Sequence, residues 1–378
     1  MLCRALWGII WSTALFLALA HPAAGFGRES AIGQIDQITG TVKVTRGDDQ
    51  EIKAKAGMPL LPGDQITTEK ASIVWFSLNH AGIFKLNEEA QLSMDELANS
   101  DQDENHPVLR LILGYLWSKL KSAIPNKPIK MTLHTPTAII GVRGTEFDTA
   151  AALDAATMVV VDQGRVEVEG ENGKVTLTPG EMTRVDLDTQ PSAPAAALPR
   201  DKRNWDEWLN NKMAQLRENL PQTAPKFSKR FVFLTDRVTE LAQEVSKSSE
   251  QVAEAIAKVR RALTEGNRKK VNQAAMSLRE PAQNFRETAA RFRWRLNRAR
   301  VFSKLSNRLE TFVIKNAGKF SKEQFAVIDA HLVLISQKRM EMKNVSRQAI
   351  YNMRRTFKEL QEVRRDIKAF RQSQRGGN

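Results

Sequence analysis

Residues 135–150 read TPTAIIGVRGTEFDTA, and this stretch decides how the first half of the chain is interpreted. Its two glycines, Gly141 and Gly144, are compatible with a phosphate-binding loop or with a structural corner. A phosphate-binding loop follows a strand, opens a helix and in its P-loop form places Lys beside Ser or Thr. Here strand-like sequence lies on both sides and no helix follows. The stretch is therefore expected to form a corner between β-strands, with Arg143 and Glu146 paired to each other or to turn carbonyls.

The residues around this stretch, 33–188, carry the alternation of apolar and polar side chains that is typical of half-buried strands. Examples are IVWFSL at 73–78 and RVEVE at 165–169. Turn signals lie between such runs, among them PGD at 62–64 and PGE at 179–181. Proline presets φ at the second position of a turn, and glycine supplies a positive φ at the third. Many short strands with closely spaced turns predict an all-β roll or sandwich domain.

From residue 201 to 372 the period of the apolar residues becomes helical. The intervening segment 189–200 is rich in Pro and Ala and is predicted to be a semi-extended linker. Beyond it, apolar residues recur in alternating steps of four and three, which predicts coiled-coil packing. Because the connections are short, consecutive helices should be antiparallel neighbours. The second half is expected to be an all-α, elongated antiparallel coiled-coil bundle with helices at about 201–220, 226–265, 267–316 and 321–372.

Proline and glycine set the expected limits of these helices. Pro221 should end the first helix, and Gly266 should end the second. Pro281 should kink the third helix without ending it. Ser321 and Gln324 have the spacing of a capping box that opens the fourth helix.

Charge is distributed unevenly between the two halves. The whole chain of 378 residues has a formal net charge of +14. Residues 1–199 carry 17 basic and 24 acidic side chains, and residues 200–378 carry 40 basic and 19 acidic side chains. Such asymmetry indicates two modules with different surfaces and favours an anionic partner for the second. The two halves could also bind one another, and the sequence leaves that question open.

The first 25 residues have the pattern of a secretory signal peptide. Arg4 precedes a short apolar run, and small residues follow it at 23–25. Cys3, the only cysteine, lies inside this segment. We therefore expect an exported protein without disulfides, located in the periplasm, with secretion or an uncleaved membrane anchor as alternatives.

The sequence offers no catalytic constellation. It has no Gly-x-Ser-x-Gly elbow and no cysteine outside the signal peptide. The histidines at 80, 106, 134 and 331 are not at the short spacing of a zinc pair. The acidic run 101–105 begins like a calcium loop, but His106 replaces the required glycine and Ile112 the required glutamate. We predict no catalytic residue, no metal and no cofactor.

The densest basic cluster is RFRWRLNRAR at 291–300. On a helix Arg291, Arg295 and Arg298 lie along one flank, because they are three or four residues apart. The interleaved apolar residues belong to the coiled-coil seam and cannot stack on bases, so nucleic acid is not an expected partner. The flank is a candidate anion-binding site for lipid headgroups, lipopolysaccharide phosphates or peptidoglycan carboxylates. A solvated basic face without a ligand is the alternative.

Three patterns together resemble the signature of the FecR-type domain of bacterial periplasmic proteins. TPTA…GVRGTEF at 135–147 resembles the central motif, the G-x-V…PGD pattern before it resembles the start of the domain, and the G-x-V…PGE pattern after it resembles the end. The resemblance covers about residues 33–188. The residues expected to have structural roles in this signature are Pro62, Gly63, Asp64, Pro136, Gly141, Arg143, Gly144, Thr145, Glu146, Phe147, Pro179, Gly180 and Glu181.

What the resemblance implies is a non-enzymatic β module that engages other proteins or envelope components. Founding members of the family carry signals across the inner membrane with an anti-sigma segment, a membrane helix, the β domain and a C-terminal part that contacts a transporter. This chain departs from that plan. No anti-sigma segment is expected ahead of its signal peptide, and a basic helical half stands in place of the usual C-terminal part.

The expected function is therefore that of an exported binding or sensing module of the cell envelope, with a protein partner. Two alternatives remain open. The protein could tether peptidoglycan or an anionic lipid surface, or it could regulate transmembrane signalling together with a separate sigma or anti-sigma partner. The sequence leaves the oligomeric state open, including a homo-oligomer.

Overall fold

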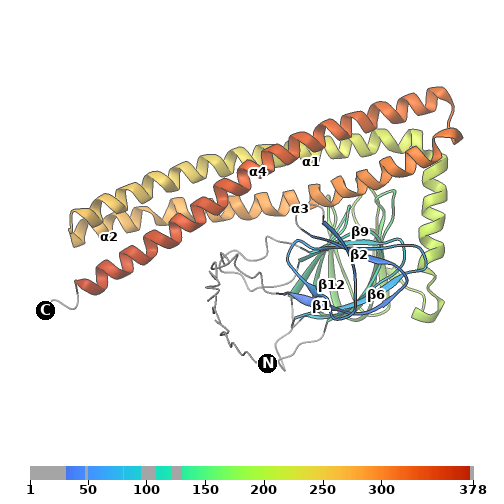
Figure 1. The fold of residues 1–378 in the computed structure, drawn as a ribbon, viewed down its shortest axis with the longest axis horizontal. Helices are drawn as coiled ribbons and strands as arrows, with labels where there is room; N and C mark the ends of the chain where they lie inside the picture. Colours follow the sequence, from blue (N-terminus) through green and yellow to red (C-terminus); the bar gives the residue numbers. More distant parts are fainter. Residues whose placement is uncertain (1–30, 47–49, 80, 95–107, 121–129, 375–378) are drawn as a thin grey trace, which may run out of the picture. The chain divides into compact units, whose positions relative to one another are not determined.

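The computed structural model describes residues 31–46, 50–79, 81–94, 108–120 and 130–374. A large β-sheet occupies the first half of the described chain, and long helices occupy the second half (Figure 1). Residues 31–378 form one compact unit. The predicted fold class, an all-β domain followed by an all-α bundle, is confirmed. The predicted signal peptide at 1–25 lies outside the described residues.

The sheet contains fifteen described strands, and among them only β9 and β10 are neighbours in parallel. The order along its main path is β15-β14-β12-β11-β10-β9-β7-β6-β1-β4, with β2, β3, β5, β8 and β13 paired beside it. The strands are β1 (Gly33–Thr39), β2 (Val42–Arg46), β3 (Gln50–Lys53), β4 (Pro59–Leu60), β5 (Gln65–Thr68), β6 (Ile73–Leu78), β7 (Gly82–Leu86), β8 (Gln91–Met94), β9 (Val108–Leu120), β10 (Lys130–His134), β11 (Ile139–Ala151), β12 (Thr157–Glu169), β13 (Lys174–Leu177), β14 (Glu181–Val185) and β15 (Ala195–Ala196).

Alternation builds the core of the sheet. In β6, for example, every second side chain of IVWFSL is buried, beginning with Val74. Phe76 of β6 lies opposite Phe84 of β7, and their rings stack with centroids 5.1 Å apart. Aromatic pairs of this kind stabilise a sheet beyond the area that they bury.

The helices are α1 (Trp205–Thr264), α2 (Arg268–Ser277), α3 (Arg279–Asn316) and α4 (Lys322–Ser373). The prediction that the first helix ends at Pro221 holds to within two residues, because the range of α1 contains two helices that meet at a kink. Asn219 leaves helical geometry at this kink, with φ −107° and ψ 15°. The Thr223 hydroxyl donates to the Asn219 carbonyl at 2.8 Å, and the Asn219 amide donates to the Gln215 carbonyl at 3.0 Å. These bonds hold the kinked turn together while the proline removes a backbone donor.

The helical pattern continues past Pro281, as predicted, since Leu278, Ala282 and Phe285 all belong to the buried seam. The expected third helix is interrupted between α2 and α3 only at Leu278, which keeps helical φ and ψ, and Pro281 lies in the first turn of α3. A proline in a first turn costs little, since the backbone N–H groups there have no intrahelical partner. The capping box of Ser321 and Gln324 at the start of α4 is confirmed.

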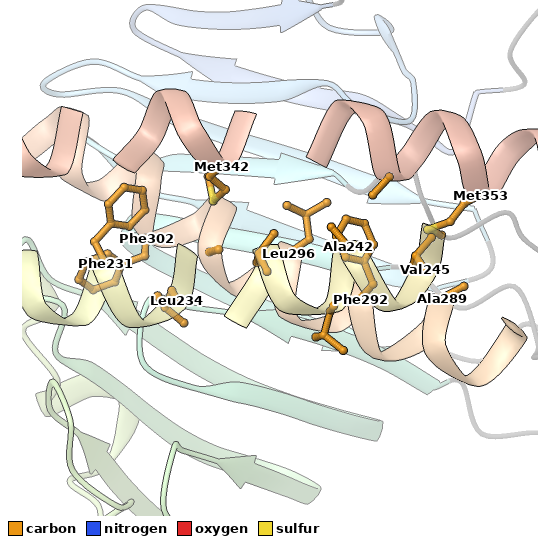
Figure 2. Close-up of a cluster of buried hydrophobic side chains, with 14 of the residues drawn as sticks. Phe231, Leu234, Ala242, Val245, Ala289, Phe292, Leu296, Phe302, Met342 and Met353 are labelled. Carbon is orange, nitrogen blue, oxygen red and sulfur yellow. The ribbon is translucent and has the colours of Figure 1, made fainter. Parts of the chain in front are cut away.

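The three long helices form the predicted antiparallel bundle (Figure 1). α1 packs extensively on both α3 and α4, whereas α3 and α4 contact each other much less. The four-three rows face the common core, as Figure 2 shows for Leu234 and Val245 of α1, Phe292 and Leu296 of α3, and Met342 of α4. The helices of the described ranges contain no uninterrupted apolar stretch of the length that a membrane span requires.

The two halves contact each other through a shared apolar and polar interface. Ile112 of β9 and Leu153, which follows β11, belong to the same buried cluster as the helix seam. Arg110 of β9 donates to the Asn297 side chain of α3 at 2.7 Å, within buried surroundings. The acidic and basic halves, whose contact the sequence left open, therefore pack as parts of one unit.

Candidate functional site

The signature stretch lies in β11, which pairs with β12 over a long antiparallel ladder. The expected corner is wrong, because residues 139–151 form one continuous strand. Arg143 lies opposite Arg165 and Glu146 lies opposite Gln163, so two residues of β11 face one residue of β12 between them. This is a β-bulge, in which an extra residue bends a strand and increases its twist.

The bulge changes which side chains of β11 face the core of the sheet. Before it, Ile140 and Val142 belong to that core, and after it Phe147 does. The extra residue shifts the even-numbered positions to the opposite face, since side chains alternate with a period of two. Glu146 and Asp148 are consequently placed on the face that does not belong to the apolar core of the sheet.

Glycine permits the bulge at two facing positions. Gly144 has φ +61° and Gly164 has φ +84°, both in the left-handed region. A Cβ on Gly164 would lie 2.6 Å from the Thr145 methyl carbon and 2.8 Å from the Gly144 carbonyl oxygen. The close approach of the two strands thus depends on the absence of a side chain at Gly164.

We expect Gly164→Ala to lower the free energy of unfolding by about 2–4 kcal/mol, from the unfavourable φ and the steric overlap. Gly180→Ala is a matched control, because Gly180 also has φ +84° but a Cβ added to it would have no atom within 4 Å. It should cost only about 1–2 kcal/mol. Urea unfolding followed by circular dichroism measures both variants, and equal costs would contradict the role of the close approach.

Glu146 and Asp148 bind two arginines from the segment that leads to α1. Arg200 contacts Glu146 at 2.5 Å and Asp162 at 2.6 Å. Arg203 contacts Asp148 at 2.6 Å and Asp162 at 2.7 Å. We call these three acids and two arginines the linker clamp. Because Asp148 is fully buried, Arg203 supplies the charge that makes its burial tolerable.

Aromatic side chains complete the linker clamp. The Tyr115 hydroxyl of β9 donates to Asp148 at 2.7 Å, and its ring stacks on Trp205, the first residue of α1, at 5.1 Å. The guanidinium of Arg200 lies 5.6 Å from the centre of the Trp117 ring, within the range of a cation–π contact. The start of α1 is thus held to the β9–β11 part of the sheet by stacking and by charge.

The pKa directions follow from these contacts. Burial raises the pKa of Asp148 above its ordinary value despite hydrogen bonds from Tyr115 and Arg203. Burial also raises the pKa of Tyr115, and the neighbouring Asp148 charge adds to the effect. Burial acts in the same direction on Glu146, but hydrogen bonds from Lys119 and Arg200 outweigh it and lower the pKa of that carboxyl.

The expected pair between Arg143 and Glu146 does not form among the described residues. Glu146 pairs instead with Lys119 at 3.0 Å and with Arg200. Arg143 is exposed on β11 and is aligned with Lys130 on one side and Arg165 on the other. The alternation before the bulge points Arg143 outward, while the bulge turns Glu146 toward the linker, so the two side chains have different surroundings.

The linker is attached to the sheet rather than free. Part of it forms β15, which pairs with β14 at the register Glu181–Ala196. Its end forms a short 3₁₀ turn, Arg200–Lys202, that carries one arginine of the linker clamp. The composition of the linker predicted an extended conformation. It did not predict the pairing with β14 or the ion pairs of Arg200, because these contacts depend on residues distant in the sequence.

A second charged site joins the hairpin after β12 to the bundle. Glu171 contacts Arg230 of α1 at 2.5 Å, Arg298 of α3 at 3.0 Å and Arg295 of α3 at 3.7 Å. We call these four residues the Glu171 cluster. The Trp294 ring lies 4.5 Å from the Arg295 guanidinium and 5.4 Å from that of Arg298.

This cluster corrects the predicted anion-binding flank. Arg298 is only 1% exposed, so it cannot be part of an exposed binding surface. Burial lowers its pKa to about 10, although the Glu171 charge opposes that shift. Arg291 pairs with Glu244 of α1 at 3.0 Å. Arg295 and Arg298 thus meet a carboxylate of the β domain, and Arg291 meets one within the bundle.

The remaining signature residues lie in turns and in the core. Pro136 stands in the turn before β11, between Thr135 and Thr137, whose hydroxyls form buried hydrogen bonds of 2.8 Å with Thr157. Phe147 is fully buried in the core of the sheet. Sequence reasoning missed this threonine network, although its Thr-Pro-Thr spacing was visible.

In each of the two Pro-Gly-acid turns, the acidic side chain accepts a hydrogen bond from the backbone N–H three residues before it. Asp64 accepts the Leu61 backbone N–H at 2.8 Å, and Glu181 accepts the Thr178 backbone N–H at 2.7 Å. Asp64 is in addition paired with Arg46 at 2.7 Å. Gly63 supplies φ +88° in the first turn, as a turn of this kind requires.

The histidines of the described part have local partners or core positions. His134 ends β10 and is buried, and His331 of α4 is 2.8 Å from the Ser228 hydroxyl of α1. No group of three or more potential metal ligands occurs within the described ranges. His80, His106 and the acidic run 101–105 lie outside them.

A cavity of about 610 Å³ lies where the β2–β5 part of the sheet faces α1 and α3. Its lining mixes acids and bases, and Lys43 pairs there with Glu51 at 3.6 Å and with Glu69 at 3.3 Å. The lining includes threonine hydroxyls but no histidine, serine or cysteine.

Part of the β-sheet matches a known protein family. Residues 64–167 match the family model described as FecR protein, which confirms the resemblance seen in the signature for that part of the chain. The matched segment contains the bulge and the three acids of the linker clamp. The sequence has no match among curated proteins.

Two solved structures of candidate anti-sigma factors from Parabacteroides distasonis are similar to part of the chain. Their sequence identities are 20% and 18%, and their TM-scores are 0.30 and 0.29. Each comparison covers 35% of this chain and 59% of the other chain. This chain therefore spans about three fifths of the length of those two proteins.

Proposed function

We propose that this protein is a non-enzymatic signalling protein of the bacterial envelope, whose FecR-type β domain and helical bundle act together as a binding module for a protein partner. The match of residues 64–167 to the FecR family supports a signalling or regulatory role. The sequence of the first 25 residues favours export to the periplasm.

The observation that carries this proposal is the linker clamp. The FecR-type segment supplies Glu146, Asp148 and Asp162, and all three are bound by arginines of the segment that leads to the bundle. A binding event that displaces these arginines would change how the bundle is held. Breaking these ion pairs would release the segment before α1 from the sheet, and a change in the β domain could in this way alter the position of the helices.

Several acidic residues of the β domain are already paired with arginines of the same chain, and this pairing indicates which surface a partner would bind. Glu171, Glu146 and Asp148 of the β domain are taken up by arginines of the linker and the bundle. As long as these ion pairs are formed, those carboxylates offer little charge to a second protein. Most of the remaining uncompensated charge is the positive charge of the bundle, so we expect an acidic partner surface.

Crosslinking in the intact host bacterium tests the proposal. The full chain with an affinity tag is crosslinked in place, captured, and compared by mass spectrometry with an unrelated exported protein that carries the same tag. We expect one envelope protein to be strongly enriched with the full chain. If every protein is recovered equally with the control, the proposed binding function is contradicted.

A tether to an anionic surface is the second candidate, because the end of the bundle at α2 is strongly basic. Residues 258–287 and 354–371 together contain 15 Lys and Arg but only 6 Asp and Glu. Co-sedimentation with purified sacculi and with anionic vesicles measures this binding. Binding by charge alone should weaken as salt shortens the Debye length from about 10 Å at 0.1 M to about 3 Å at 1 M.

A further inference from the structure

An open groove lies between the α2–α3 segment and the last turns of α4. Its volume is about 940 Å³. Its apolar lining residues include Ala275 and Ala282 on one side and Leu360 and Ile367 on the other. We call it the terminal groove, because it lies at the end of the bundle where α4 finishes (Figure 1).

The walls of the terminal groove carry one sign of charge. Arg279 and Arg286 stand on the α3 side, and Arg364, Lys368 and Arg371 stand on the α4 side. None of the fourteen lining residues is a carboxylate. Arg371 donates to the Asn272 side chain at 3.0 Å, and this amide carries no charge that would compensate the guanidinium. Low-dielectric walls with one sign of charge concentrate the field in such a groove.

The lining repeats every seven residues. Ala275 and Ala282 are seven apart, and so are Leu360 and Ile367. The cations follow the same period, with Arg279 seven residues before Arg286 and Arg364 seven before Arg371. This is the period of the bundle's own seam, whose apolar residues pack by knobs into holes and continue along the groove.

The packing of the bundle leaves room for another helix. α3 and α4 each pack mainly on α1 and contact each other little, so the terminal groove stays open between them. Residues 272–286 and 360–372 extend for about 18–21 Å at 1.5 Å per residue, which matches three to four helical turns. Met276 in the lining is 66% exposed and offers a flexible apolar contact.

We propose that the terminal groove binds an acidic amphipathic helix of a protein partner. Apolar side chains of that helix, repeated at heptad spacing, would pack over Ala275, Ala282 and Ile367. Asp and Glu on its two flanks would pair with the arginines on the two walls, as in charge-assisted recognition of a helix in a groove. This inference rests on the proposed binding function and names the chemical class of the partner.

Two synthetic helical peptides of about 18 residues test it. Both carry leucine at heptad a and d positions, and their flanks are glutamate in one peptide and lysine in the other. Fluorescence anisotropy with the full chain should show binding of the glutamate peptide and none of the lysine peptide. Absence of binding by the glutamate peptide, or equal binding of both, would overturn the proposal.

Matched variants show whether the groove itself is the site. Arg279→Glu with Arg364→Glu reverses two exposed cations of the lining, and we expect affinity for the glutamate peptide to fall at least about tenfold. Lys269→Glu with Arg354→Glu makes the same change of net charge at exposed positions outside the lining, and should alter affinity by about twofold or less. Equal losses in the two double variants would contradict a specific groove.

Other occupants are distinguished by two further measurements. If the groove variant loses binding to phosphatidylglycerol vesicles while the glutamate peptide never binds, the occupant is a lipid and the proposal fails. If light scattering shows self-association that only the groove variant abolishes, the occupant is a second copy and the proposal also fails. If crosslinking recovers a partner equally well with the groove variant, this inference fails while the proposed binding function stands.

Discussion

Replacing Arg203 with alanine should lower the free energy of unfolding by about 3–5 kcal/mol, because it removes one partner of a buried ion pair. The Arg203 side chain is 8% exposed and contacts both Asp148 and Asp162. Without it, Asp148 keeps only the Tyr115 hydroxyl among these clamp contacts and remains fully buried. Urea unfolding followed by circular dichroism measures the loss.

Arg143→Ala is the appropriate control for this prediction. It removes an arginine from the same FecR-type segment, but from an exposed position on β11. Substitutions at such positions usually change stability by about 0.5 kcal/mol or less. If Arg143→Ala costs as much as Arg203→Ala, the linker clamp is not the reason why Arg203 matters.

Replacing Glu171 with alanine should have an effect of similar size, about 3–5 kcal/mol. The change leaves Arg230, Arg295 and Arg298 close together without the carboxylate that they share. The largest cost falls on Arg298, because its guanidinium is buried and cannot replace the lost carboxylate with water. The contact between the hairpin after β12 and the bundle should loosen, which amide hydrogen exchange in α3 would reveal.

Two further variants separate charge from packing at the Glu171 cluster. Glu167→Gln changes a nearby acid whose pair with Lys174 at 3.2 Å is exposed, and it should cost only about 0–1 kcal/mol. Glu171→Leu combined with Arg298→Met should recover part of the loss, since apolar replacement of a buried pair is often nearly neutral. A double variant as unstable as Glu171→Ala would argue that the lost charge pairing is not the cause.

The pH dependence of stability has a definite sign at Glu171. Burial raises the pKa of this carboxyl, but the hydrogen bond from Arg230 and the charges of Arg298, Arg230 and Arg295 outweigh burial and lower it below the ordinary value of 4.5. Stability from Glu171 is therefore present above the unfolded-state pKa and is lost as pH falls through the lower folded-state pKa. Glu171→Ala should remove this contribution to acid unfolding.

The elements of the fold were largely predictable because their signals are local. Alternation in β6, the four-three rows of the helices and the capping box at Ser321 are each contained within one segment. The effects of Pro221 and Pro281 are local as well: a helix ends at the kink two residues before Pro221, and the buried row continues past Pro281. The bulge in β11 was missed, since its detection requires the register with β12.

At the candidate site, too, signals that lie within one segment were readable from the sequence, and contacts between residues far apart in the chain were not. The sequence by itself determined the two-part architecture, the FecR-type signature and the charge asymmetry, because hydrophobic period, turn chemistry and composition act along the chain. Only the tertiary structure decided that Arg203 binds Asp148 and that Arg298 is buried against Glu171. An ion pair depends on the distance and burial of two side chains, and for residues far apart in the chain both are set by how the strands and helices pack.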